Sequence, residues 1–106
     1  MKMHVLKINN DYIEAVFTGT KKAELRKNDR DFKIGDLISF INVDGTQISP
    51  AQKASVTKPS YYQNLFLITD ICEYKDALKE GYVMLSLERC VYFTLEYYDK
   101  YLKERN

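Results

Sequence analysis

The sequence has few of the residues that build metal centres, disulfide frameworks or membrane spans. Its 106 residues include one histidine and two cysteines, Cys72 and Cys90, with no Cys-x-x-Cys pair. This count argues against a zinc site, and the two thiols, which lie in apolar segments, are expected to be free and buried. No apolar run exceeds four residues, whereas a bilayer span needs about 20. Lys2 and Lys7 stand where a signal peptide would be apolar, so we expect a cytoplasmic protein with no membrane contact. We also expect no metal and no cofactor.

Neither sign of charge dominates the chain. Sixteen Lys and Arg residues stand against fifteen Asp and Glu residues, and the formal net charge is +1. This balance excludes broad coating of nucleic acid by bulk charge, because that mode needs many surplus cations, but it leaves local basic patches open. With 106 residues, 45% of them hydrophobic, the chain is long enough for one core and too short for two. We therefore expect a single domain over residues 1–106, with its core at 4–92.

Hydrophobic periodicity predicts an α+β fold. A short helix is expected at about 11–18, where Asp11 and Glu14 resemble a capping box and Gly19 supplies a left-handed end. A C-terminal helix is expected at about 94–105, where apolar residues recur at helical spacing. Period-two segments and short apolar runs predict strands at 4–9, 22–27, 37–43, 65–74 and 82–87. So few strands bury their apolar faces best as a small β-barrel or a curled, mostly antiparallel sheet.

Basic residues concentrate in one window, residues 21–33, which holds six cations and three carboxylates. On an extended strand, Lys22, Glu24 and Arg26 share one face and Leu25 points the other way. A carboxylate between two cations is held ionised, and in return it orients them. This arrangement suits a pocket that recognises a polar ligand, such as a base edge or a phosphate. The simpler alternative is a solvated, ion-paired hairpin.

The same window resembles a known family. Residues 19–26, Gly-Thr-Lys-Lys-Ala-Glu-Leu-Arg, fit the G-x-K-x-x-E-x-R signature of the ASCH superfamily (activating-signal-cointegrator homology). The Arg-Lys-Asn-Asp-Arg-Asp-Phe run that starts at the last of these residues makes the chain similar to a small, uncharacterised bacterial and phage subfamily. The resemblance covers residues 4–44 well and 65–88 loosely. The loop 46–64 and the tail 89–106 do not match and are expected to be additions of this protein.

This resemblance implies a PUA-like fold with a cleft lined by the Gly19–Arg30 segment, and RNA as the usually proposed partner of the superfamily. One branch contains amidohydrolases that deacylate an acetylated cytidine nucleoside. The lysine of its G-x-K step corresponds to Lys21, whereas Glu24 stands where that branch has a threonine. The alternative function is therefore an amidohydrolase acting on a modified nucleoside, with Lys21 as base or nucleophile and Glu24 as proton shuttle.

The leading expectation is a small RNA-binding module whose ligand is RNA or a single nucleotide or nucleoside. Tyr61 and Tyr62, in a polar loop, are expected either to stack on unpaired bases or to pack that loop as a lid. His4 is expected to be a structural histidine with a polar partner, and not a ligand contact. A third alternative is a protein-interaction module, or a homodimer, that uses the loop and the C-terminal helix. The expected ligand-binding residues are Lys21, Lys22, Glu24, Arg26, Lys27, Arg30, Tyr61 and Tyr62.

Overall fold

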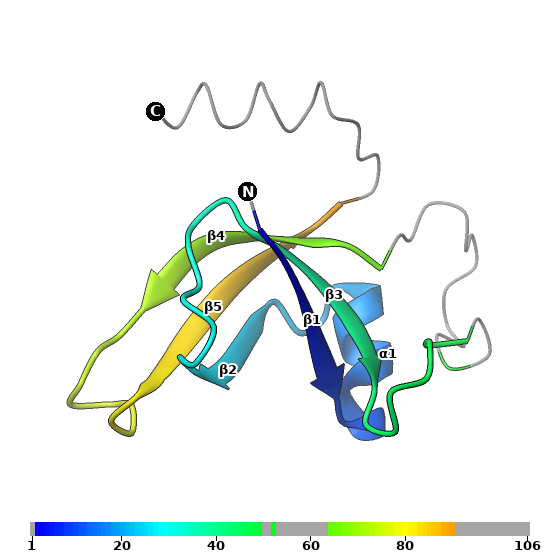
Figure 1. Cartoon of the computed structure of the whole chain (residues 1–106), viewed down its shortest axis with the longest axis horizontal. Coiled ribbons are helices and arrows are strands. Elements are labelled where there is room, and N and C mark those ends of the chain that lie inside the picture. Colours follow the sequence, from blue (N-terminus) through cyan, green and yellow to red (C-terminus); the bar gives the residue numbers. More distant parts are fainter. Residues whose placement is uncertain (1, 50–51, 53–63, 91–106) are drawn as a thin grey trace.

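The computed structural model describes residues 2–49, 52 and 64–90. Its strands and helix are β1 (Met3–Ile8), α1 (Asn10–Thr18), β2 (Ala23–Lys27), β3 (Leu37–Asn42), β4 (Phe66–Cys72) and β5 (Tyr82–Arg89). The strands form one sheet in the order β1–β3–β4–β5–β2. β1 and β3 are parallel, and the other three neighbouring pairs are antiparallel. The sheet curls into a half-barrel whose two edges, β1 and β2, are the first two strands of the chain (Figure 1).

The curled, mostly antiparallel sheet with an early helix is confirmed. Each expected strand is present, with both ends within two residues of the sequence-based prediction. In the described part of the chain, α1 is the single α-helix, and no helix there has the length and apolar character needed to cross a bilayer. The C-terminal helix expected at 94–105 lies outside the described residues. The structure therefore shows a strand-rich domain with one mixed sheet. Along the chain, α1 connects the two edge strands, β1 and β2.

The two ends of α1 are set by Asn9 and Gly19. Asn9 is the N-cap, with an extended backbone, and its side-chain oxygen accepts a hydrogen bond from the Asp11 N–H at 2.9 Å. The expected capping box of Asp11 and Glu14 is therefore wrong, because the cap lies two residues earlier than Asp11. Gly19 has φ 83°, the left-handed conformation expected of it, and its N–H donates to the Val16 carbonyl. The chain thus leaves the helix sharply and enters β2 four residues later.

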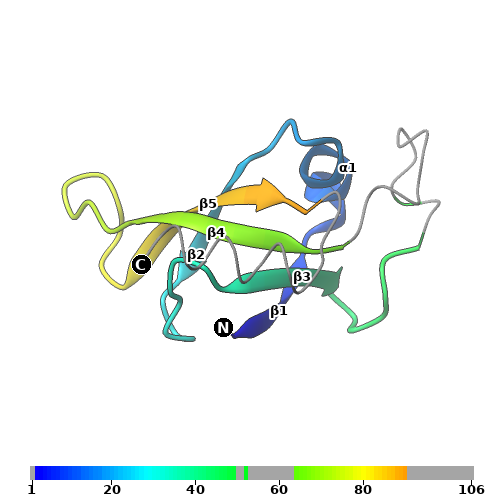
Figure 2. The same ribbon diagram turned by 90° about the horizontal axis from the view of Figure 1, so that it is seen from above.

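The main core lies inside the curl, between the sheet and α1 (Figure 2). Ile13, Val16 and Phe17 form the buried face of α1. Phe66 on β4 contacts two rings edge-on, Phe17 with centroids 5.6 Å apart and Phe40 with centroids 5.3 Å apart. These contacts hold the helix against β4 and, through Phe66, beside β3, and they determine where the segment after Gly19 begins.

A second, smaller cluster lies on the opposite face of the sheet. Leu37, Leu67 and Cys90 are buried there, and the alternation of a strand places Leu37 opposite the core residue Ile38. Burial raises the pKa of the Cys90 thiol to about 11, and the charge of Glu88 adds to this shift, so Cys90 is protonated at neutral pH. Both thiols were expected to be buried. This prediction is wrong for Cys72, which ends β4 at the exposed margin of the sheet.

A buried hydrogen bond between His4 and Asp36 joins β1 to the turn before β3. The Nε2 atom of His4 lies 2.8 Å from Oδ2 of Asp36, and both side chains are 6% exposed. The backbone N–H groups of Lys2 and Lys33 also donate to this carboxylate, each at 3.1 Å. Burial raises the pKa of Asp36, but the hydrogen bonds from His4 and the two backbone groups outweigh it and hold that pKa below its usual 3.8. His4 thus has the polar partner expected of it, and its ring packs against Phe32 with centroids 4.7 Å apart.

Candidate functional site

β2 turns its polar side inward. Glu24 is only 8% exposed, whereas Leu25 beside it is 53% exposed. Leu25 faces its cross-strand partner Met84 on the outer surface, and Met84 is exposed as well. An edge strand of a small sheet normally buries its apolar side and exposes its charges. The inversion in β2 therefore costs stability by itself, which is a reason to look for a role of the buried carboxylate.

Three charged side chains meet inside the curl, and we call Lys21, Glu24 and Arg26 the charged triad. Lys21 Nζ lies 3.2 Å from Oε1 of Glu24 and also donates to the Ala23 carbonyl. Arg26 Nη2 lies 3.8 Å from the other carboxylate oxygen, Oε2. The Glu24 side chain is 10% exposed, against 27% for Lys21 and 24% for Arg26. The carboxylate is thus held between two cations, as the sequence predicted.

The identity of the first cation differs from the prediction. Lys22 was expected to share the face of Glu24 and Arg26, but β2 begins at Ala23 and Lys22 is exposed. Lys21 contacts Glu24 instead, because its position just after the left-handed Gly19 lets the side chain fold back along the strand. The ring of Tyr12 on α1 lies 5.8 Å from Lys21 Nζ, so the ammonium group also has an aromatic neighbour.

Two buried polar atoms of the charged triad have no hydrogen-bond partner. These are Oε2 of Glu24 and Nε of Arg26, both shielded from solvent. Buried polar atoms in proteins are nearly always hydrogen-bonded, so an acceptor and a donor left open on neighbouring side chains require an explanation. The same carboxylate has its other oxygen bonded to Lys21. The triad therefore has one free acceptor with donors on either side of it.

Arginine side chains bridge the seam, by which we mean the open side of the curl between β1 and β2. Arg26 Nη2 donates to the Lys7 carbonyl at 2.6 Å, and Arg30 Nη1 donates to the Val5 carbonyl at 3.0 Å. Both carbonyls belong to β1, an edge strand that pairs along its other side with β3. Two of the expected binding residues thus donate hydrogen bonds to carbonyl groups on the open edge of β1. Arg26 does so while it also lies beside the carboxylate of Glu24.

The remaining expected site residues fall into two groups. Lys22 and Lys27 are exposed at the two ends of β2, and neither side chain forms a hydrogen bond or ion pair within residues 2–49, 52 and 64–90. Tyr61 and Tyr62 lie outside the described residues. The structure therefore brings together Lys21, Glu24 and Arg26, places Arg30 at the seam, and leaves the two exposed lysines free to meet a ligand.

A hollow of about 230 Å³ adjoins the triad at Lys21. Val16, Phe66 and Leu87 form its apolar part. The rest of the lining consists of Gly19 and four charged residues: Lys21, Lys22, Glu88 and Arg89. Arg89 was missed by the sequence analysis because it lies far along the chain from the basic window. It comes close because β5 ends beside α1, where Arg89 Nη1 donates to the Phe17 carbonyl at 2.5 Å.

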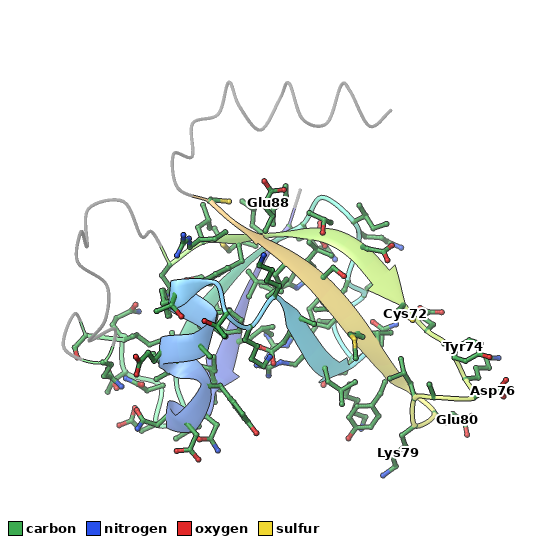
Figure 3. The ribbon with its side chains drawn as sticks, turned by 180° about the vertical axis from the view of Figure 1, so that it is seen from behind. Cys72, Tyr74, Asp76, Lys79, Glu80 and Glu88 are labelled. Carbon is green, nitrogen blue, oxygen red and sulfur yellow. The ribbon has the colours of Figure 1, made fainter. Side chains whose placement is uncertain are left out.

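A larger hollow of about 360 Å³ lies at the far end of the molecule from α1, at the connection between β4 and β5 (Figure 3). None of the expected site residues lines it. Its charged residues are two glutamates and two lysines, and it contains none of the unpartnered buried atoms found in the described part of the chain. Its lining consists of Asn28, Glu73, Lys75, Leu78, Lys79, Glu80, Gly81, Tyr82 and Val83. The charged triad is therefore the stronger candidate.

Comparison with known proteins gives one family. No match to the chain exists among the curated proteins. The family model described as Domain of unknown function (DUF3850) matches residues 3–87. That range contains β1 to β4, most of β5, the charged triad and both arginines of the seam. Because the match spans most of its 106 residues, the chain belongs to the DUF3850 family.

Proposed function

We propose that this protein is a small cytoplasmic RNA-binding module of PUA-like fold that holds single-stranded RNA at the charged triad. The observation that carries the proposal is Oε2 of Glu24, a buried carboxylate oxygen between two cations that accepts no hydrogen bond. The edge of an unpaired base supplies the N–H donor that this oxygen lacks. The resemblance of Gly19–Arg26 to the ASCH signature supports the same function, because the triad consists of its lysine, glutamate and arginine.

The charges around the triad favour a base over a phosphate as the group held inside. A phosphate placed at Oε2 would meet a carboxylate of the same sign, whereas a neutral base edge would not. The exposed Lys22 and Lys27 lie outside, where phosphates of the strand can reach them. Each phosphate contact to single-stranded nucleic acid contributes a slope of about −0.7 to log K against log salt, so two lysines predict a modest slope of roughly −1.4.

Glu24→Gln should weaken RNA binding at least about tenfold. Glutamine keeps the shape of the side chain but loses its charge, and a hydrogen bond to a charged group contributes about 1.5–3 kcal/mol where one to a neutral group contributes about 0.5–1.5 kcal/mol. The measurement is fluorescence anisotropy of a labelled single-stranded RNA of mixed sequence, titrated with the wild-type protein and the variant at low and high salt.

The matched control is Glu14→Gln on the exposed side of α1, away from the triad. It should bind RNA like the wild type, and the thermal unfolding of all three proteins shows whether Glu24→Gln remains folded. If the wild type does not bind single-stranded RNA, or if the two glutamine variants bind equally well, the proposal is wrong.

The second candidate function is hydrolysis of an acylated nucleoside, and the observation in its favour is the 3.2 Å contact between Lys21 Nζ and Glu24. A lysine and a carboxylate at this distance form a pair that can pass a proton. Against it, Lys21 donates to two oxygens, those of Glu24 and Ala23, and an amine must free a lone pair to act as base or nucleophile. We therefore rank binding above catalysis.

Incubation of the pure protein with N4-acetylcytidine should give no release of cytidine and acetate above the rate without protein. Liquid chromatography of the nucleosides checks this result. Lys21→Ala and Lys22→Ala are a matched pair, because the two lysines are neighbours and only Lys21 contacts Glu24. Turnover that is lost in Lys21→Ala and kept in Lys22→Ala would make the protein an amidohydrolase.

A further inference from the structure

We infer that the charged triad selects the imide edge of a uracil-type base, in which one N–H lies between two carbonyl oxygens. The inference rests on the proposed function, because it names which base the RNA site takes. Its starting point is the order of hydrogen-bonding groups along the Glu24 carboxylate. Lys21 lies at the Oε1 end and Arg26 at the Oε2 end, so a donor stands on each side of an acceptor.

The free hydrogen-bonding capacity of the triad follows from counting its protons and lone pairs. An ammonium group has three protons. Lys21 donates one to Oε1 of Glu24 and one to the Ala23 carbonyl, which leaves one proton free. Arg26 has its Nε–H open, and Glu24 has Oε2 open. The array that the protein offers is therefore donor, acceptor, donor, and its complement is acceptor, donor, acceptor.

Each cation of the triad already donates one of its other protons to a backbone carbonyl. Lys21 donates to the carbonyl of Ala23, and Arg26 donates to the carbonyl of Lys7. The acceptor between these two cations is the one that lacks a partner. The missing group is therefore an N–H flanked by carbonyl oxygens, which is the Watson–Crick edge of uracil.

Entry of a base requires the seam to open locally. Oε2 of Glu24 and Nε of Arg26 are shielded from solvent while Arg26 holds the Lys7 carbonyl. A carbonyl oxygen of the base then accepts from the Nε–H of Arg26, so the guanidinium gains an acceptor as Nη2 releases the Lys7 carbonyl. The bond from Arg30 to the Val5 carbonyl lies farther along the seam and keeps β1 and β2 together during the exchange.

The other bases leave groups of the triad unsatisfied. Cytosine has no acceptor on the outer side of its amino group, so the free proton of Lys21 finds no partner. Guanine presents two adjacent N–H donors and needs two free acceptors, but Oε1 is already held by Lys21. The amino group of adenine has two protons for the one free oxygen. A buried polar group without a partner is costly, and this cost favours uracil.

The test compares fluorescence anisotropy titrations of the protein with four labelled oligonucleotides of equal length: oligouridine, oligocytidine, oligoadenosine and oligo(N3-methyluridine). Oligouridine should bind at least about tenfold more tightly than oligocytidine and oligoadenosine, because each of those bases leaves a buried polar group of the triad without a partner. Methylation of N3 removes the donor that Oε2 accepts, so the methylated strand should lose the preference completely.

The outcomes separate this inference from the proposed function. Binding of all four strands with equal affinity leaves RNA binding in place and overturns the imide inference, as expected if one buried water bridges the two open atoms. Binding of none of them, nor of a mixed-sequence RNA, overturns the proposed function. Tighter binding of oligocytidine than of oligouridine also overturns the inference.

Two variants test whether the triad is the source of the preference. Glu24→Gln can turn its amide N–H₂ toward the base, where it donates to the ring nitrogen of cytosine, so the uridine-to-cytidine affinity ratio should fall at least about fivefold. Lys27→Gln should weaken every strand by a similar factor, reduce the salt slope by about 0.7 and leave that ratio unchanged. An unchanged ratio in Glu24→Gln would overturn the inference.

Discussion

Asp36→Ala should destabilise the folded protein by about 3–5 kcal/mol, because each buried donor left without its acceptor costs about 1–3 kcal/mol and this variant leaves more than one. The carboxylate accepts from His4 Nε2 at 2.8 Å and from two backbone N–H groups, and all three donors lose their acceptor together. Urea unfolding followed by circular dichroism measures the loss. Asp29→Ala is the control, because Asp29 is an exposed residue of the same charged window and should change the free energy of unfolding by less than about 0.5 kcal/mol.

The pH dependence of this pair gives the prediction a second readout. Burial raises the pKa of Asp36, but the hydrogen bonds from His4 and the backbone N–H groups of Lys2 and Lys33 hold it below 3.8 in the folded state. The unfolded chain therefore binds this proton more readily than the folded one. The stabilising contribution is complete above 3.8 and is lost as the pH falls through the lower folded pKa.

The difference in stability between the wild type and Asp36→Asn should consequently narrow as the pH falls from about 5 to about 2. Asparagine is the right comparison for this readout, because it keeps the size of the side chain and does not titrate. A difference that stays constant over this range, or a small effect of Asp36→Ala at neutral pH, would show that the pair contributes little to the fold.

Arg26→Glu should destabilise the protein by about 3 kcal/mol or more, whereas Arg30→Glu should cost no more than about 1 kcal/mol. Both arginines donate to a carbonyl of β1, so each variant loses one hydrogen bond across the seam. Only Arg26 also faces the buried carboxylate of Glu24, at 3.8 Å, and its reversal places two carboxylates side by side. The matched pair therefore separates the charge effect from the loss of a seam contact.

Urea unfolding of the two variants beside the wild type measures this difference. The double variant Glu24→Gln with Arg26→Gln removes both charges and keeps both shapes, and it should recover most of the stability lost in Arg26→Glu. Equal destabilisation by Arg26→Glu and Arg30→Glu would mean that the seam bonds matter and that the charge of Glu24 does not.

The strands and α1 were predictable from local patterns. In β1, the alternation of Leu6 and Ile8 with exposed neighbours is visible in the sequence, and the structure buries those two residues. Gly19 likewise indicates the end of α1 without any tertiary information, because its left-handed backbone is unfavourable for other residues. The cap at the other end was misassigned, since Asn9 and Asp11 are both good N-cap residues and the choice between them depends on where β1 ends.

The sequence indicated the segment that contains the candidate site, but not which of its side chains contact one another. The crowding of cations around Glu24 is a property of the sequence, and so is the expectation that Arg26 shares its face. The choice of Lys21 over Lys22 as the first cation depends on β2 starting at Ala23, and strand ends are the least certain part of a pattern-based prediction. The burial of Glu24 and the exposure of Leu25 also reverse what hydrophobicity alone predicts.

The local sequence pattern therefore determines the one helix and five strands that the structure describes. Helices and strands each place buried residues a fixed few positions apart, and the spacing of hydrophobic residues along the chain shows this. The curl of the sheet decides the rest. It brings Arg26 to the Lys7 carbonyl 19 residues away and Arg30 to that of Val5 25 residues away, while the parallel pairing of β1 with β3 brings His4 to Asp36 across 32 residues. No short-range spacing encodes such contacts, since they depend on the strand order β1–β3–β4–β5–β2, which places the first two strands of the chain at opposite edges of one curled sheet.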